Sequence, residues 1–188
     1  MGLFDIFLIS IGLSADAFAV AVSIGLCMRG FKDKIKGTLV VAAYFGVFQA
    51  GMPVVGYTTA SLFYTQVSDY GDIIAFAVLA VIGCKMIWES FKKDKEVCEI
   101  DTKLSLTPAY MIPFAFVTSI DALVVGSSFA FLEGVVILHA AAFIGVSTFV
   151  LSAIGFGFGN MLGAKMQGYA NLIGGVVLIL IGVGIIIK

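Results

Sequence analysis

The sequence predicts an all-α membrane protein with six transmembrane helices, arranged as two inverted three-helix repeats. Composition gives the class, because 61% of the 188 residues are hydrophobic, only 12% are charged and the mean hydropathy is +1.12. A chain of this size with so little polar surface cannot coat a soluble globule. The lengths of the apolar stretches give the helices, and an internal repeat gives their arrangement.

Six hydrophobic stretches are long enough to cross a hydrocarbon core of about 30 Å. They lie near residues 4–27, 38–57, 72–91, 110–132, 135–159 and 169–187. The remaining residues form short loops and one charged connector, which leaves no room for a soluble catalytic domain. The first stretch begins MGLFDIFL, without Lys or Arg, so it is not expected to be a cleaved signal peptide.

Basic residues gather in the loops that follow the first, third and fifth predicted helices. They are Arg29, Lys32, Lys34, Lys36, Lys92, Lys93, Lys95, Lys103 and Lys165. An excess of Lys and Arg in short loops marks the cytoplasmic side of a membrane. These loops are therefore expected inside the cell, and both termini outside.

The two halves of the chain resemble each other. SADAFAVAVSIG at 14–25 aligns with SIDALVVGSSFA at 119–130, a shift of 105 (119 minus 14), and FGVFQAGMPVVG at 45–56 aligns with IGVSTFVLSAIG at 144–155, a shift of 99 (144 minus 45). Three helices in each copy force the second copy to enter the membrane from the opposite side, as in many secondary transporters. The predicted domains are repeat 1 (1–91), a charged cytoplasmic linker (92–108) and repeat 2 (109–188).

Asp16 and Asp121 occupy matching positions in the middle of apolar helices. A carboxylate at the centre of a bilayer costs about 2.5–3.5 kcal/mol on insertion scales, so an acid there marks a functional site. The inverted repeat places both acids at the same depth. We therefore expect them to share one cation.

The groups expected around this pair are oxygen donors. Ser23 and Ser128 each follow an aspartate by seven residues, and Gln49 precedes Pro53 by four, so that the proline is expected to expose the Gln49 carbonyl. Gln49 is interpreted either as a ligand or pathway residue or as a hydrogen-bonding link between helices. Oxygen ligands suit Mg²⁺, Ca²⁺ and Mn²⁺, and the single histidine, His139, lies away from the pair.

Three further residues are candidates for the transport pathway or its gates, together with Pro53. Thr118 shares a helix face with Asp121. Lys85 and Glu89 are one turn apart near the predicted cytoplasmic end of the third helix. They form either an interfacial ion pair or a gate or proton relay at the inner mouth.

Four segments together resemble the MntP-type manganese efflux pumps: SADAFAV, FGVFQAGMPVVG, IGCKMIWESF and TSIDALVVG. The resemblance covers essentially the whole chain. It implies export of Mn²⁺ across the bacterial plasma (inner) membrane, a distant relationship to the lysine exporter superfamily, and transport roles for Asp16 and Asp121. Some relatives carry an acid in the second helix where this chain has Gln49.

The expected activity is alternating-access export of Mn²⁺ as a proton antiporter, with manganese as the substrate, no cofactor, no enzymatic reaction, and lipid but no nucleic acid as a partner. The chain has no phosphate-binding loop for ATP. The alternative is an amino-acid exporter of the lysine exporter type. An intramembrane aspartyl protease is disfavoured, because neither aspartate follows a GxG sequence, and a purely structural bundle would have no use for two buried acids.

Overall fold

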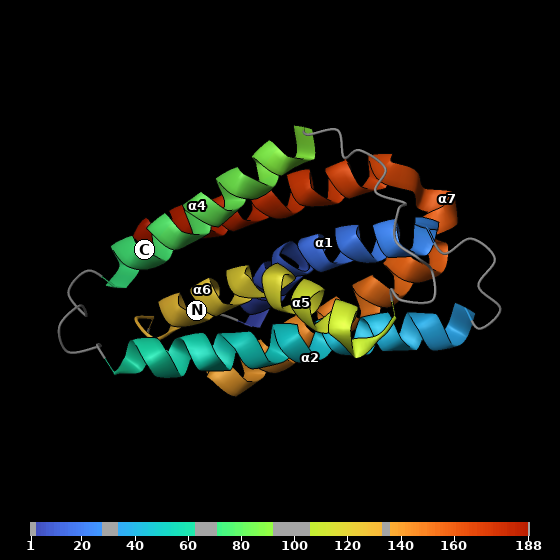
Figure 1. Cartoon of the computed structure of the whole chain (residues 1–188). Helices are drawn as coiled ribbons and strands as arrows, with labels where there is room; N and C mark the ends of the chain where they lie inside the picture. Colours follow the sequence, from blue (N-terminus) through green and yellow to red (C-terminus); the bar gives the residue numbers. More distant parts are fainter. Residues whose placement is uncertain (1–2, 28–33, 63–70, 92–105, 133–135, 188) are drawn as a thin grey trace.

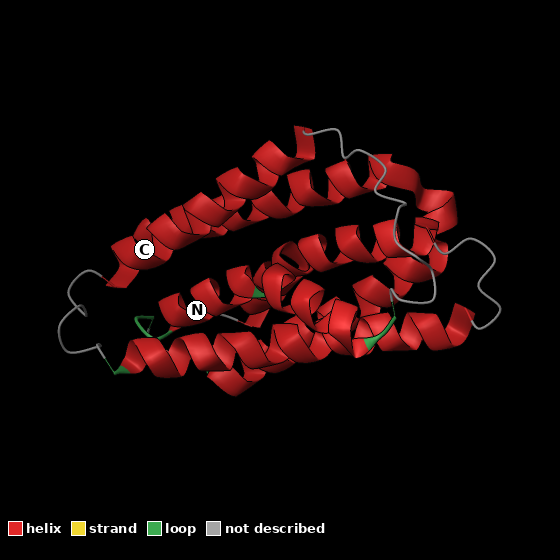
Figure 2. Ribbon diagram, viewed as in Figure 1, coloured by secondary structure: helices red, strands yellow, loops and turns green. Residues whose placement is uncertain are grey.

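The computed structural model describes residues 3–27, 34–62, 71–91, 106–132 and 136–187. Its helices are α1 (Leu3–Cys27), α2 (Lys34–Ser61), α4 (Gly71–Phe91), α5 (Pro108–Thr118), α6 (Ile120–Phe129) and α7 (Ile137–Ile186) (Figure 1). No β-strand occurs in these ranges (Figure 2). The predicted all-α class is therefore confirmed for the described part of the chain. Most of the predicted linker, residues 92–105, lies outside it.

The helices have the length and hydropathy of membrane spans. Three segments qualify singly, Phe4–Gly25, Lys34–Ser61 and Ile137–Gly159, and α5 and α6 qualify together as one bent pair. Shorter apolar segments are Ile73–Trp88 in α4 and Leu172–Ile185 in α7. The chain is thus a multi-pass membrane protein, and the number of six spans stays a prediction.

The stretch predicted over residues 110–132 is not one straight helix, because α5 and α6 meet at Ser119 with a bend of 41°. The Ser119 backbone N–H donates to the carbonyl of Phe116, 3.2 Å away, instead of to the carbonyl four residues back. The Ser119 hydroxyl donates to that Ala115 carbonyl at 2.6 Å. Hydroxyls that bond back to the helix in this way bend it.

The two helices predicted over 135–159 and 169–187 are joined in one helix, α7, which reverses direction at the right of Figure 1. Gly155 packs against Phe18, and Gly174 packs against Ala15 of the same helix α1. A straight helix would separate Gly155 from Gly174 by about 28 Å. The first arm of α7 (Ile137–Gly159) and the second arm (Leu172–Ile185) therefore both pass along α1.

Glycines set the distances between the helices. The backbone of Gly56 in α2 lies against the Leu123 carbonyl of α6, and Gly126 of α6 lies against the backbone of Pro53. Gly83 of α4 similarly faces the second arm of α7 at Gly175. Small residues allow this close approach, which stabilises helix pairs in lipid where the hydrophobic effect does not.

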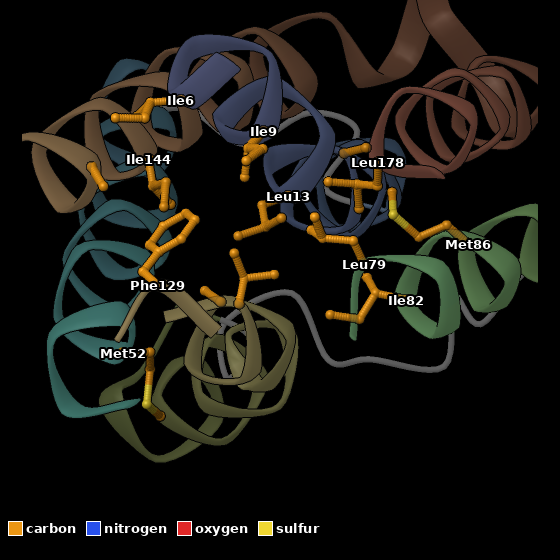
Figure 3. Close-up of a cluster of buried hydrophobic side chains, with 14 residues drawn as sticks. Ile6, Ile9, Leu13, Met52, Leu79, Ile82, Met86, Phe129, Ile144 and Leu178 are labelled. Atoms are coloured by element: carbon orange, nitrogen blue, oxygen red, sulfur yellow. The ribbon is translucent and has the colours of Figure 1, made fainter. Parts of the chain in front are cut away.

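α1 lies at the centre of the bundle and carries the main apolar cluster. Its Ile9 and Leu13 point toward Phe129 of α6 and toward Leu178 of α7, and Leu79 of α4 completes this side (Figure 3). A second cluster lies nearer the C-terminal half of α1. Its members are Ala17, Ala21, Ile24, Val41, Phe45, Met111, Ala115 and Phe156.

The C-terminal half of α4 lines an open apolar groove of about 420 Å³. The described residues that line it are Cys84, Ile87, Trp88 and Phe91. Trp88 and Phe91 are exposed. Exposed aromatic side chains of membrane proteins concentrate at the membrane–water interface.

We predict that Gly56→Ala lowers the free energy of unfolding by about 1–3 kcal/mol, the usual cost of overpacking, because its methyl group would overlap the Leu123 carbonyl. Gly51→Ala on the same helix is the control, since nothing lies within 4 Å of that position. The control is expected to be neutral or to gain up to about 1 kcal/mol from helix propensity. Unfolding in detergent micelles measures both, and equal effects would contradict the described contact between α2 and α6.

Candidate metal centre

Asp121 lies in the first turn of α6, directly after the break at Ser119. Its side chain is only 7% exposed. One carboxylate oxygen, Oδ1, accepts a hydrogen bond from the Ala122 backbone N–H at 2.8 Å, whereas Oδ2 is buried without a hydrogen-bond partner. The positive end of the α6 dipole faces the carboxylate and offsets part of the cost of burying it.

Asp16 lies in the middle of α1, which runs unbroken through this position. Its Oδ1 atom is buried. The carboxylates of Asp16 and Asp121 repel each other electrostatically, and the Lys85 ammonium of α4 attracts Asp121. The structure therefore brings the two acids from the two halves of the chain within electrostatic reach of each other.

Gln49 joins α2 to the break between α5 and α6. It is fully buried, and its Nε2 donates to the Thr118 carbonyl at 3.0 Å. Its Oε1 is buried without a hydrogen-bond partner. One amide group thus has both of the features considered from the sequence, a link between helices and an oxygen that is available to a ligand.

The hydroxyl candidates bond to their own helices. Ser23 donates to the Ala19 carbonyl at 3.2 Å, Ser128 to the Val125 carbonyl at 2.7 Å and Thr118 to the Phe114 carbonyl at 2.9 Å. Seven residues of helix correspond to a rise of about 10.5 Å. Ser23 and Ser128 therefore lie well along their helices from the aspartate that precedes each of them.

The remaining pathway candidates are more scattered. Pro53 is buried in α2, where its backbone contacts Gly126, and the helix continues through it to Ser61. Lys85 is exposed on α4. The side chain of Glu89 lies outside the described part of the structure, so its pairing with Lys85 stays a prediction.

A network of hydroxyls between α1 and α7 was not predicted. The Oγ atoms of Ser10 and Ser147 are 3.0 Å apart. The Oγ of Ser14 is 2.8 Å from the Oγ1 of Thr148. The sequence suggested only that Ser14 bonds back to its helix, which it also does at the Ser10 carbonyl. The repeat alignment could have indicated a polar contact here, because its shift of 99 positions pairs Thr148 with Gln49.

The chemistry of the centre comes from few groups. Among the residues that the structure describes, no three His, Cys, Asp or Glu side chains form a metal-binding group. Two carboxylates and one amide oxygen are hard donors, which suit a divalent cation that keeps part of its water shell. Buried acids within apolar, membrane-spanning helices are the features of an ion-translocating membrane protein.

Comparisons with known proteins agree with this class. The family model described as "Putative manganese efflux pump" matches residues 32–186. A relative of that description from Corynebacterium glutamicum is 42% identical over 99% of this chain and 97% of its own length. One from Desulfitobacterium hafniense is 43% identical over 100% of this chain and 96% of its own. No solved structure matches.

The chain belongs to the MntP family of manganese efflux pumps. This is a family of transporters and not of enzymes, as the absence of a catalytic domain in the sequence predicted. The matched region includes α2, α4, α5, α6 and α7, and the relatives extend the match over α1.

We predict that Gln49→Leu lowers the free energy of unfolding by about 1–3 kcal/mol, because it removes the donor that the half-buried Thr118 carbonyl accepts from. Ser152→Ala is the control. The Ser152 hydroxyl is also fully buried but has no hydrogen-bond partner, so its removal is expected to be neutral or stabilising. Chemical unfolding in micelles gives both values, and a neutral Gln49→Leu would show that the link to Thr118 contributes nothing.

Proposed function

We propose that this protein exports Mn²⁺ from the cytoplasm and binds it between Asp16 and Asp121. The observation that carries the proposal is the burial of the Asp121 carboxylate, with one oxygen unpaired, beside a second carboxylate of like charge. Two such acids repel each other in a medium of low dielectric. A divalent cation between them removes the repulsion and supplies the missing partner.

The donors favour a hard cation. Gln49 adds its unpaired Oε1 to the two carboxylates, and waters complete the coordination. Mn²⁺ accepts carboxylate, amide and water ligands, whereas Zn²⁺ and Cu⁺ sites rely on imidazole and thiolate. The relatives' description as manganese efflux pumps supports the choice of Mn²⁺ among the hard cations. Ser23 and Ser128, about two turns away along their helices, belong to the pathway and not to the first coordination shell.

Alternating access follows from the inverted repeat, and equivalent contacts support that repeat. Gly56 packs on the Leu123 carbonyl, and Gly155 packs on the Phe18 carbonyl. The sequence alignment pairs Gly56 with Gly155 (a shift of 99) and Phe18 with Leu123 (a shift of 105), so the two contacts are equivalent.

Gly46 and Gly145, which the alignment also pairs, face each other directly. A Cβ atom on Gly46 would lie 3.2 Å from the Gly145 carbonyl oxygen, and one on Gly145 would lie 3.1 Å from that of Gly46. Such reciprocal contacts are expected at a pseudo-two-fold axis, around which the two halves rock to open the site to each side in turn.

Export needs an energy source. Moving a double positive charge outward against a membrane potential of 100 mV costs about 4.6 kcal/mol, from about 2.3 kcal/mol for each charge. Proton antiport supplies this energy: the ionised aspartates bind Mn²⁺ from the cytoplasm, and protons from outside displace it. With the basic loops in the cytoplasm, both termini lie outside.

We predict that Asp16→Asn and Asp121→Asn each reduce Mn²⁺ efflux at least about tenfold. Removing even an outer-shell partner of a metal typically costs at least about this factor in affinity or activity. The measurement is Mn²⁺ accumulation in a manganese-sensitive host that lacks its own exporter. Asp5→Asn, the same change in the first turn of α1, is the control and should retain efflux. Full rescue by both site variants would refute the proposed centre.

We predict that Mn²⁺ uptake into everted membrane vesicles rises when their lumen, which corresponds to the outside of the cell, is made acidic. A lumen one pH unit below the medium provides the driving force for exchange. Uptake that ignores the gradient while Mn²⁺ binding is intact would disprove proton coupling. If the vesicles instead take up lysine or other amino acids that compete with one another, and added Mn²⁺ does not affect this uptake, the result would favour the amino-acid exporter.

A further inference from the structure

Lys85 is a basic residue inside an apolar segment of α4. The segment is Ile73–Trp88, and Lys85 is exposed on its surface. At the depth of a bilayer core, an ammonium group costs about 2.5–3.5 kcal/mol on insertion scales unless it finds a partner or reaches the interface. The position of Lys85 relative to the two acids therefore decides what it does.

Contacts around Gly174 fix the depth of this part of α4. A Cβ atom on Gly174 would lie 2.7 Å from the Met86 Cε, 3.2 Å from the Ala15 Cβ and 3.0 Å from the Gly12 carbonyl oxygen. Gly175, the next residue of α7, packs against the Gly83 carbonyl and the Ile87 backbone nitrogen, so residues 83–87 of α4 lie near the level of Gly12 and Ala15, just before Asp16. Lys85, the residue before Met86, lies at the depth of the acid pair and not at the end of its helix.

The charges around Lys85 are few. Asp121 of α6 attracts it, and Asp16 of α1 repels Asp121. α5 contains no Asp, Glu, Lys or Arg, the described side chains of α7 include none, and those of α2 are limited to Lys34 and Lys36 in its first turn. On α4 itself, the side chain of Glu89 is outside the described part. The acid pair and Lys85 thus carry a summed charge of −1 when the acids are ionised.

We propose that Lys85 is a positioning residue that competes with the transported cation: its ammonium partly neutralises Asp16 and Asp121 in the metal-free protein and moves away when a divalent cation binds. This inference rests on the proposed function. Lysine suits the role, because its charge is compact and its four-carbon stem is flexible. The competition lowers the affinity for the metal and promotes its release on the outer side.

The test is Mn²⁺ binding to the purified full chain in detergent, followed through the EPR signal of free Mn²⁺. Lys85→Gln should bind Mn²⁺ at least about tenfold more tightly, since a unit charge near a divalent ion in a medium of low dielectric changes its binding by at least that factor. Its efflux rate should fall because release slows. Lys85→Arg, which keeps the charge, should bind within about threefold of the wild-type protein. Lys36→Gln, exposed at the start of α2, removes the same charge far from the acids and should leave affinity unchanged.

Unchanged or weaker binding in Lys85→Gln would overturn the inference, because a lysine that only anchors α4 at the interface does not compete with metal. If Lys85→Gln does not fold, Lys85→Met provides the same test with an unbranched side chain. The proposed function has a separate control: Asp16→Asn and Asp121→Asn must weaken Mn²⁺ binding. If they do so while Lys85→Gln has no effect, only the role of Lys85 fails. If they do not, the metal centre itself fails.

Discussion

The break between α5 and α6 depends on the side chains that satisfy its backbone carbonyls. A bilayer offers no water to a carbonyl that loses its helical partner, so each such group must be paired within the protein. At this break the Ser119 hydroxyl donates a hydrogen bond to the Ala115 carbonyl, and the Gln49 side chain of α2 donates one to the Thr118 carbonyl. With these bonds in place, α6 begins just before Asp121 and directs its N-terminal dipole at that carboxylate. The close contact of α2 with α6 through Gly56 and Gly126 holds Gln49 within reach of the break.

The two segments that the repeat alignment pairs differ in structure at their acids. α1 continues without a break past Ser14 and Asp16, whereas the corresponding helix is bent at Ser119, two residues before Asp121. Ser14 and Thr148 occupy positions that the repeat register pairs with Ser119 and Gln49, and they bond to each other through their hydroxyls. The two aligned helices therefore differ in conformation at the residue two positions before each acid.

Hydropathy predicted most of the helices because each is a long apolar run, and the acids stood out because charge is rare in such runs. Hydropathy did not predict the break at Ser119, because hydroxyls that bond to the preceding turn leave the average polarity of a segment unchanged. It also did not predict that α7 stays helical where it reverses direction. The depth of Lys85 depends on how Gly174 brings α4 and α1 together, a packing relation between helices distant in sequence. For Gln49, the sequence indicated two roles, and only the structure showed that its nitrogen and oxygen have different environments.

The apolar groove on α4 also has a consequence for spectroscopy. Trp88 is the only tryptophan of the chain, it lines that groove, and it follows Lys85 by three residues, which is less than one helical turn. All indole fluorescence of the protein therefore comes from one exposed position on α4. The unlabelled wild-type chain therefore carries one optical reporter on α4, three residues from Lys85.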